Sequence, residues 1–324
     1  MNAKAVNSMS LNDPEKTIDL IIPVYNEAGV VEHTYGQIRE VIQRLPYKFH
    51  VFLVDDGSSD GTPESLAVLA RQDECITVLT LSRNFGHQAA LTAGLDASAG
   101  DFVITLDADG QHPPEMIPQM IALFEQGYDI VQAQRIEEDE SFSFKKATSS
   151  GFYSLINRIS GTRMTAGAAD FRGMSRQVVE ALKSMPEYHR FLRGMIAWMG
   201  YRSAILPYHE TRRVAGESKY SLRKMFRLAM DAIFSFSLVP LYIGLSAGIT
   251  FFCLAALEMI YVLSFWVTGR TSNLAPGWSS LMFVILIVSG MIMILLGFIG
   301  IYVGYIFQEV KRRPVYLLKK DLEK

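Results

Sequence analysis

Short apolar runs alternate with longer segments of helical periodicity up to about residue 215. The runs are too short for helices and are rich in β-branched and aromatic residues, so they predict β-strands. These strands span residues 17–24, 49–54, 76–81, 101–106 and 129–133. The intervening segments predict helices to about Leu45, after Pro63 and through Leu95. Strands that alternate with helices in this way predict an α/β domain with a mostly parallel, doubly wound sheet.

The apolar pattern changes after residue 237. Residues 238–267 contain a single charged side chain, Glu258, and residues 278–307 contain none. Each run exceeds the roughly 20 residues that a helix needs to cross a bilayer, so each predicts a transmembrane helix. Residues 268–277 between them are polar and contain Gly and Pro, which break helices. The pair therefore predicts a two-helix transmembrane hairpin with both chain ends on one side.

Basic residues flank the outer ends of this hairpin, whereas its connecting loop has only Arg270. The flanking residues are Lys219, Arg223, Lys224 and Arg227 before it and Lys311, Arg312, Arg313, Lys319 and Lys320 after it. The positive-inside rule therefore predicts a multi-pass plasma-membrane protein whose α/β domain and both termini are cytoplasmic. Residues 218–237 place apolar and cationic side chains on different faces at helical spacing, which predicts an amphipathic helix at the membrane interface.

These patterns divide the whole chain into segments. A disordered tail at 1–15 precedes the α/β domain at 16–217, and a basic cytoplasmic tail occupies 308–324. The interfacial helix, the two spans and the extracytoplasmic loop at 268–277 lie between them. Gly244-x-x-x-Gly248 and Gly300-x-x-x-Gly304 allow close helix contact within the hairpin or between subunits. We therefore expect a homo-oligomer formed through the transmembrane helices.

Composition excludes some classes of protein. The formal net charge of −2 gives no basic character, so we expect no nucleic-acid partner. The two cysteines, Cys75 and Cys253, form neither a disulfide framework nor a metal-ligand spacing, and we expect both to be buried thiols. His87 and His112 also lack metal-ligand spacing and are interpreted as local hydrogen-bonding residues.

Polar side chains follow the predicted strands at the points where the strands end. The clusters are Tyr25, Asn26 and Glu27; Asp55 and Asp56; Ser82, Arg83 and Asn84; Asp107, Asp109 and Gln111; and Arg135. In doubly wound sheets, ligands bind at the carboxyl ends of the strands. The clusters therefore predict a single binding site at that edge.

The sequence Thr105-Leu106-Asp107-Ala108-Asp109-Gly110-Gln111 is the most informative of these clusters. Two carboxylates so close repel each other unless a cation lies between them. Mg²⁺ or Mn²⁺ fits such oxygen ligands and usually bridges to substrate phosphates. The alternative is an ordinary turn, because Asp and Gly are common turn residues. The dinucleotide and P-loop glycine motifs are absent from the sequence. The carboxylates therefore predict a nucleotide diphosphate that is bound together with a divalent ion. The transmembrane hairpin predicts a lipid as the second substrate.

Several segments together resemble a known family. They are Ile22-Pro23-Val24-Tyr25-Asn26-Glu27, Val54-Asp55-Asp56-Gly57-Ser58, Leu106-Asp107-Ala108-Asp109, Ala169-Asp170-Phe171-Arg172, Arg190-Phe191-Leu192-Arg193-Gly194 and the stretch from Arg212 to Tyr220. In order and spacing they resemble the inverting family-two glycosyltransferases of the GT-A fold. More narrowly they resemble the polyprenyl-phosphate glycosyltransferases, the group of bactoprenol glucosyltransferase and dolichyl-phosphate mannose synthase.

The resemblance implies roles for individual residues. Nucleotide binding would fall to Pro23, Tyr25, Asn26, Glu27, Asp55, Asp56, Ser82, Asn84, Asp107 and Ala108. Asp107, Asp109 and Gln111 would hold the metal on the diphosphate, with Asp109 essential for catalysis. Asp170 would contact the sugar or act as a base, with a structural carboxylate as the alternative. A phosphate monoester has its second pKa near 6 and is largely dianionic at neutral pH, so the acceptor phosphate needs no strong base.

The acceptor phosphate needs cations. Arg135 is the first choice, because a guanidinium grips phosphate with two hydrogen bonds; the alternative is a surface arginine. Relatives with a second downstream arginine suggest a paired clamp, and here Lys145 or a neighbouring lysine would take that place. Arg212, Arg213 and Lys219 surround a glycine-containing segment that we expect to close over the diphosphates, and the alternative is a solvated charge run.

Other classes of membrane protein are alternative interpretations of the sequence. A membrane scaffold could keep the fold without turnover, but it has no need for repelling carboxylates. A processive polysaccharide synthase needs more spans and usually a Q-x-x-R-W segment, and a flippase needs more than one hairpin unless it forms oligomers. The resemblance favours UDP-glucose as donor, with inversion at the anomeric carbon. GDP-mannose, N-acetylglucosamine and aminosugar donors remain alternatives.

Overall fold

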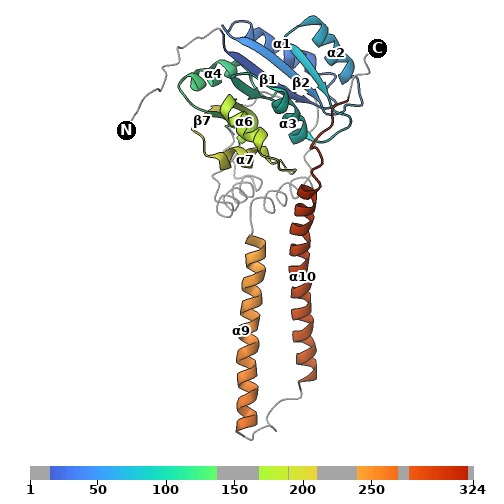
Figure 1. Ribbon diagram of the computed structural model, residues 1–324, viewed down its shortest axis with the longest axis vertical. Helices are drawn as coiled ribbons and strands as arrows, with labels where there is room; N and C mark the ends of the chain where they lie inside the picture. The colour runs from blue at the N-terminus through green and yellow to red at the C-terminus, as the bar shows by residue number, and fades with distance from the viewer. Residues whose placement is uncertain (1–14, 137–167, 189, 210–238, 269–276, 320–324) are drawn as a thin grey trace. The chain divides into compact units, whose positions relative to one another are not determined.

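The computed structural model describes residues 15–136, 168–188, 190–209, 239–268 and 277–319 (Figure 1). The chain divides into two compact units, Met1–Met225 with Arg313–Lys324, and Phe226–Arg312. Several predictions lie outside the described residues. They concern the tail up to residue 14, Lys145, the interfacial helix 218–237, loop residues 269–276, and Arg212, Arg213 and Lys219.

The larger unit contains a seven-stranded sheet in the order β3-β2-β1-β4-β6-β5-β7. Its strands are β1 Thr17–Val24, β2 Lys48–Asp55, β3 Ile76–Thr80, β4 Phe102–Thr105, β5 Ile130–Arg135, β6 Ala168–Ser175 and β7 Ser203–Tyr208. The five strands expected from the apolar runs are confirmed. Neighbouring strands are parallel except where β6 is involved, so the sheet is mostly parallel, as predicted.

Strand β6 is the feature that the apolar pattern did not predict. It pairs antiparallel with both β4 and β5, and β7 extends the sheet in parallel beside β5. Because β6 runs against its neighbours, it begins at the edge where β4 and β5 end. Thr105, the last residue of β4, pairs with Arg172. Asp170, two residues earlier in β6, therefore lies just beyond the end of β4.

Helices cover both faces of the sheet. They are α1 Val31–Ile42, α2 Thr62–Gln72, α3 His87–Ala97, the short 3₁₀ helix η1 Pro114–Met116, α4 Ile117–Glu125, α6 Arg176–Ser184 and α7 Leu192–Met199. Alternate residues of β1, Leu20 among them, pack in one core cluster with the buried faces of α1, α2 and α4. On the opposite face, Gly94 of α3 lies so close to Ile21 that a Cβ there would overlap its side chain. The sheet is therefore doubly wound.

The described residues of the smaller unit form two long helices, α9 Val239–Val267 and α10 Trp278–Val310. Both predicted spans are thus helical. Among the described residues, one segment, Ile287–Val310, is long and apolar enough to count as a candidate membrane span, so crossing by both helices stays a prediction. Gly244 of α9 lies directly against Leu295 of α10, whereas a Cβ at Gly300 or Gly304 would have no neighbour within 4 Å.

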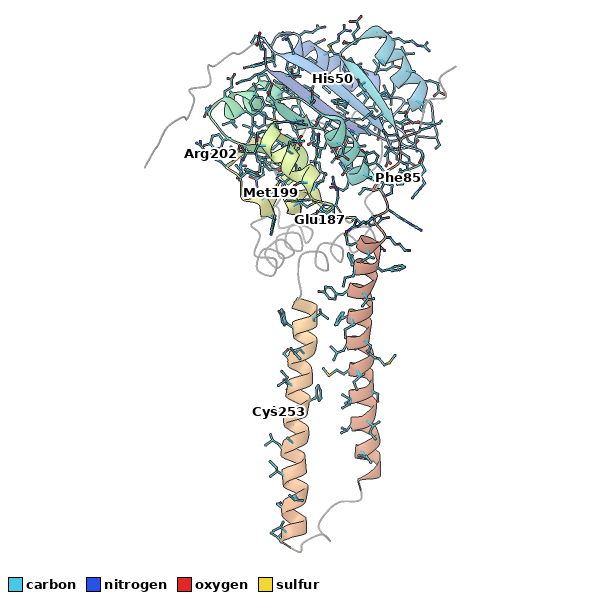
Figure 2. The ribbon with its side chains drawn as sticks, in the orientation of Figure 1. His50, Phe85, Glu187, Met199, Arg202 and Cys253 are labelled. Carbon is cyan, nitrogen blue, oxygen red and sulfur yellow. The ribbon has the colours of Figure 1, made fainter. Side chains whose placement is uncertain are left out.

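The two cysteines are both exposed in the structure. Cys253 lies on α9 (Figure 2), and Cys75 directly precedes β3 at the edge of the sheet. The prediction of buried thiols is therefore wrong. An edge strand and a two-helix unit leave much of their surface uncovered, and composition alone does not identify such positions.

The chain returns to the larger unit after α10. The helix ends at Val310, and Arg312 adopts the left-handed conformation with φ 47°, as residues just past a helix C-terminus commonly do. Pro314 follows and prevents continuation of the helix. Leu318 then forms an antiparallel bridge with Leu81, just after β3. Part of the predicted basic tail is therefore an ordered component of the larger unit.

Candidate active site

The predicted polar clusters meet at one edge of the sheet. All strands except β6 run in the same direction, so the carboxyl ends of β1 to β5 share that edge. The register pairs Val24 with Asp55 and Asp55 with Thr80, which brings together the loops that follow β1, β2 and β3. Arg135 ends β5 at the same edge, but β6 separates β5 from β4. Two inter-strand distances, from β5 to β6 and from β6 to β4, therefore place Arg135 about 10 Å from the axis of β4.

Asp55 and Asp56 are adjacent and buried, but they have different surroundings. Asp55 Oδ1 accepts a hydrogen bond from the Ser58 amide at 2.9 Å, whereas Asp55 Oδ2 is buried and has no hydrogen-bond partner. Asp56 accepts hydrogen bonds from the amides of Phe85 at 2.7 Å and Gly86 at 2.9 Å. Burial raises the pKa of Asp56 in spite of these two amides. Asp55 thus keeps one oxygen for a ligand, and Asp56 fixes a loop.

The loops after β1 and β2 are linked by hydrogen bonds. Asn26 has a left-handed φ of 54°, and its side-chain Oδ1 accepts a hydrogen bond from the Ser59 backbone N–H at 2.9 Å. The backbone N–H of Asn26 donates to Ser58 Oγ at 3.0 Å. The Glu27 amide donates to Thr62 Oγ1 at 2.9 Å. Tyr25, between these contacts and the end of β1, is partly exposed. Asn26 therefore has a structural role, and Tyr25 remains accessible to a ligand.

The loop after β3 packs against the same region. Gly57 has a φ of 67°, and a Cβ there would overlap the backbone of Arg83, so only glycine fits. The guanidinium of Arg83 lies 4.1 Å from the ring centre of Phe85. The predicted nucleotide residues Ser82 and Asn84 flank Arg83 and are exposed. The loops that follow β1, β2 and β3 thus form one continuous surface.

The segment around Asp107 has internal anchors. The Asp107 amide donates to His112 Nδ1 at 2.9 Å, and the buried His112 ring stacks on Phe171. Asp109 Oδ1 accepts a hydrogen bond from the Gln111 amide at 3.1 Å. The Ala108 carbonyl accepts from Thr34 Oγ1 at 2.9 Å. The interpretation of His112 as a local hydrogen-bonding residue is therefore confirmed.

Asp170 is the centre of a charged cluster. Arg193 of α7 donates from Nε to Asp170 Oδ1 and from Nη2 to Oδ2, each at 2.9 Å. Arg172 donates to Oδ1 at 3.1 Å. His87 Nε2 lies 3.3 Å from Asp170 Oδ2 and 3.4 Å from Asp107 Oδ1. His87 therefore links the cluster to the Asp107 segment.

These contacts shift the pKa values of the cluster. Burial alone would raise the pKa of Asp170, but Arg193, with His87 and Arg172, holds it well below its ordinary value. Burial would lower the pKa of His87, but its hydrogen bond to Asp170 and the charge of Asp107 raise it to about 9. At neutral pH the cluster is therefore an anionic carboxylate surrounded by three cations.

A metal ion would have carboxylate and amide oxygens available here. Among the described residues, no three His, Cys, Asp or Glu side chains form a preassembled metal site. Asp107 Oδ1 is nevertheless buried and accepts no hydrogen bond, and its charged neighbour is His87 at 3.4 Å. Oxygen ligands of this type suit a hard divalent cation that takes its remaining ligands from phosphates and water.

Sequence reasoning overlooked the residues that hold Asp170. Arg172 is two positions away on the same strand, so period-two alternation places both side chains on one face. Arg193 and His87 come from α7 and α3, and no local pattern connects them with β6. Lys145, Arg212, Arg213 and Lys219, predicted to bind the acceptor or the diphosphate, lie outside the described residues.

Comparisons with known proteins agree with this geometry. Residues 19–183 match the model of the family described as glycosyl transferase family 2. The SfII prophage-derived bactoprenol glucosyl transferase of Shigella flexneri is 38% identical over 94% of this chain and 98% of its own. A prophage bactoprenol glucosyl transferase homolog of Escherichia coli is 36% identical over 94% of this chain and 98% of its own. An uncharacterized glycosyltransferase of Bacillus subtilis is 38% identical over 93% of both chains.

Among solved structures, mannosyl-3-phosphoglycerate synthase from Rubrobacter xylanophilus has a TM-score of 0.49 and 20% identity, over 67% of this chain and 71% of that chain. Similarity at this level supports no functional conclusion. The family match and the long alignments with relatives stand independently of it. On these grounds, the chain belongs to glycosyl transferase family 2.

Proposed function

We propose that this glycosyltransferase moves glucose from UDP-glucose to a polyprenyl phosphate, with inversion, at the cytoplasmic face of the membrane. A phosphate oxygen of the acceptor attacks the anomeric carbon, the bond from that carbon to the diphosphate breaks, and UDP leaves. The bactoprenol glucosyl transferases named above, at 36% and 38% identity over nearly the whole chain, support the acceptor and the sugar. GDP-mannose or another nucleotide sugar is the alternative donor.

One observation carries the donor half of the proposal. Asp55 Oδ2 is buried without a hydrogen-bond partner, and Asp107 Oδ1 is buried with only the ion-pair contact from His87 and no hydrogen bond. Buried carboxylate oxygens rarely lack hydrogen bonds unless a ligand or ion completes them. Asp55 ends β2 and Asp107 follows β4, and these strands flank β1, so about 10 Å of sheet separates the two residues. This spacing suits a nucleoside at Asp55 and its diphosphate near Asp107.

The metal remains part of the proposal. Asp107, Asp109 and Gln111 would hold Mg²⁺ or Mn²⁺. When bound, the ion would stabilise the negative charge that develops on the departing diphosphate. The loop around these residues is already fixed by the bond from the Asp107 amide to His112 and by the Thr34 contact at Ala108, so its backbone needs little rearrangement.

Asp170 is better suited to positioning than to proton transfer. A carboxylate whose pKa lies well below its ordinary value is a weak base at neutral pH. Its contacts hold Arg193 of α7 and place His87 beside Asp107. A dianionic acceptor phosphate can attack without a base, so this arrangement is compatible with the reaction. Arg135 remains the proposed cation for the acceptor.

The membrane arrangement is also a proposal. Ile287–Val310 in α10 supports membrane association, and the apolar run 238–267 suits a second span. A Ser272→Cys substitution in a chain with Cys75→Ser and Cys253→Ser tests the hairpin. We expect a membrane-impermeant maleimide to label it in intact spheroplasts. Labelling only after lysis would contradict the predicted orientation.

A turnover panel tests the reaction. Purified protein in detergent receives undecaprenyl phosphate, Mn²⁺ and radiolabelled UDP-glucose, UDP-N-acetylglucosamine or GDP-mannose, and label is followed into the organic phase. We expect labelling from UDP-glucose, lost with EDTA. Labelling from another donor alone would reject glucose but keep the lipid acceptor. Folded protein that labels no lipid and binds none of the nucleotides would reject the proposal.

A further inference from the structure

The chain segment after α10 pairs with the end of β3, at one edge of the sheet beside the site. The Ser82 amide donates to the Leu317 carbonyl at 2.8 Å, and the Lys319 amide donates to the Thr80 carbonyl at 2.7 Å. These bonds lie on either side of the bridged pair Leu81 and Leu318, as in a regular antiparallel ladder. In Figure 1 this dark red segment runs beside the sheet, where β3 is the outermost described strand.

Tyr316 provides a second anchor for the same segment. Its hydroxyl donates to Asp96 Oδ2 in α3 at 3.0 Å. Burial and the Asp96 carboxylate raise the pKa of Tyr316 to about 12, so the hydroxyl remains a donor throughout the physiological range. The segment is thus attached to the end of β3 and to α3, the two elements that the loop 82–86 connects.

That loop contacts the proposed nucleotide site directly. The amides of Phe85 and Gly86 bind the Asp56 carboxylate. The Leu81 amide donates to the Asp55 carbonyl at 2.8 Å, and Gly57 packs against Arg83. Ser82, where the C-terminal segment is attached, lies next to Leu81 in sequence. A shift of this attachment is therefore transmitted through one residue to the backbone of Asp55.

We propose that residues 314–319 form a positioning element of the nucleotide site: by holding Ser82 and α3, they fix the loop 82–86 in the position that binds the donor nucleotide. No side chain of the segment needs to touch the ligand for this role. The inference rests on the proposed function, because it concerns the affinity for the nucleotide.

A pair of substitutions at one position separates the backbone contact from the side chain. Lys319→Pro removes the amide that donates to Thr80, because proline has no backbone N–H. Lys319→Ala removes the same charge and keeps the amide. Tyr316→Phe tests the second anchor without changing its ring. All variants are made in the full chain.

Two measurements on each variant give the result. Titration with UDP and Mn²⁺ should show about fivefold weaker binding for Lys319→Pro than for Lys319→Ala, the effect of one net hydrogen bond. Without ligand, hydrogen exchange at residues 82–86 should be about fivefold faster in Lys319→Pro. With UDP-glucose, the KM of Lys319→Pro should rise, because the displaced loop binds the donor more weakly, and its kcat should remain within twofold. A purely structural defect would instead reduce the active fraction and hence kcat.

The outcomes distinguish this inference from the proposed function. Equal exchange rates at residues 82–86 in Lys319→Pro and Lys319→Ala would refute the positioning role, whether or not UDP binds. Faster exchange with unchanged UDP affinity would also refute it, because the loop would then not control the site. Failure of the unmodified protein to bind any of the nucleotides would instead overturn the proposed function, and with it the nucleotide role of the segment. A further loss of affinity in the double variant Tyr316→Phe/Lys319→Pro is expected.

Discussion

The difference between Asp55 and Asp56 gives the sharpest prediction. Asp55→Asn keeps the size of the side chain and an oxygen for the Ser58 amide. It replaces the unpartnered Oδ2 with an NH₂ group. If an N–H of the nucleobase or an O–H of the ribose donates to Oδ2, the substitution places two hydrogen-bond donors opposite each other and no bond forms. It also removes a buried charge, so we expect no loss of fold stability.

The expected magnitude follows from the kind of bond that is lost. A hydrogen bond to a charged group contributes about 1.5–3 kcal/mol, which is roughly 10- to 150-fold in affinity. We therefore expect Asp55→Asn to weaken UDP binding by one to two orders of magnitude. The thermal unfolding midpoint should remain within about 2 °C. For a domain of this size, a shift of one degree corresponds to a change of a few tenths of a kcal/mol in the free energy of unfolding.

Asp56→Ala is the matched comparison. It leaves the amides of Phe85 and Gly86 without their acceptor, at a cost of about 1–3 kcal/mol. This corresponds to a fall of roughly 5 °C in the unfolding midpoint. Isothermal titration with UDP and Mn²⁺, together with thermal unfolding in the same detergent, gives both quantities. Unchanged UDP affinity in Asp55→Asn would refute the assignment of Asp55 as a ligand for the nucleotide.

Three further predictions concern the rest of the site. Asp109→Ala should abolish turnover and metal-dependent UDP binding with a normal circular dichroism spectrum, and normal turnover would remove the metal assignment. Arg193→Met should cost about 2 kcal/mol of stability in thermal unfolding, because it removes two bonds to Asp170. Since the folded-state pKa of Asp170 is depressed, its contribution is present above about pH 4 and is lost as pH falls through the folded pKa. In Arg193→Met that pKa rises, so acid unfolding should move to higher pH, and an unchanged acid midpoint would contradict this account.

The position of the site follows from local sequence. Apolar runs such as residues 17–24 determine where strands end, and alternation with helices makes them parallel, so polar residues after each run share one edge. That reasoning correctly brought Tyr25, Asp55, Ser82 and Asp107 to one edge of the sheet. It also treated Asp55 and Asp56 as equivalent. Which of the two adjacent carboxylates faces a neighbouring loop depends on the Phe85 and Gly86 amides, which belong to a different connection.

Other features depend on contacts between distant segments. Strand β6 is inserted between β4 and β5, and nothing in the residues 168–175 specifies an antiparallel neighbour on each side. Arg193 reaches Asp170 across 23 positions of sequence. The attachment of the C-terminal segment to Thr80 and Ser82 uses backbone groups alone, and such bonds have no signature in side-chain patterns. Long-range pairing of this kind is settled by the whole fold rather than by local preference.

The return of residues 314–319 to the edge of the sheet also sets an order of events during synthesis. The sheet leaves the ribosome first, but the segment that covers the end of β3 is translated only after α9 and α10. Domains generally fold as they emerge, so the nascent sheet passes through a stage in which the end of this edge strand is uncovered, and exposed strand groups invite wrong pairing. A chain cut before α9, the obvious choice for a water-soluble fragment, would remain at that stage permanently. A soluble form faithful to the native sheet would need residues 313–319 rejoined by a designed linker.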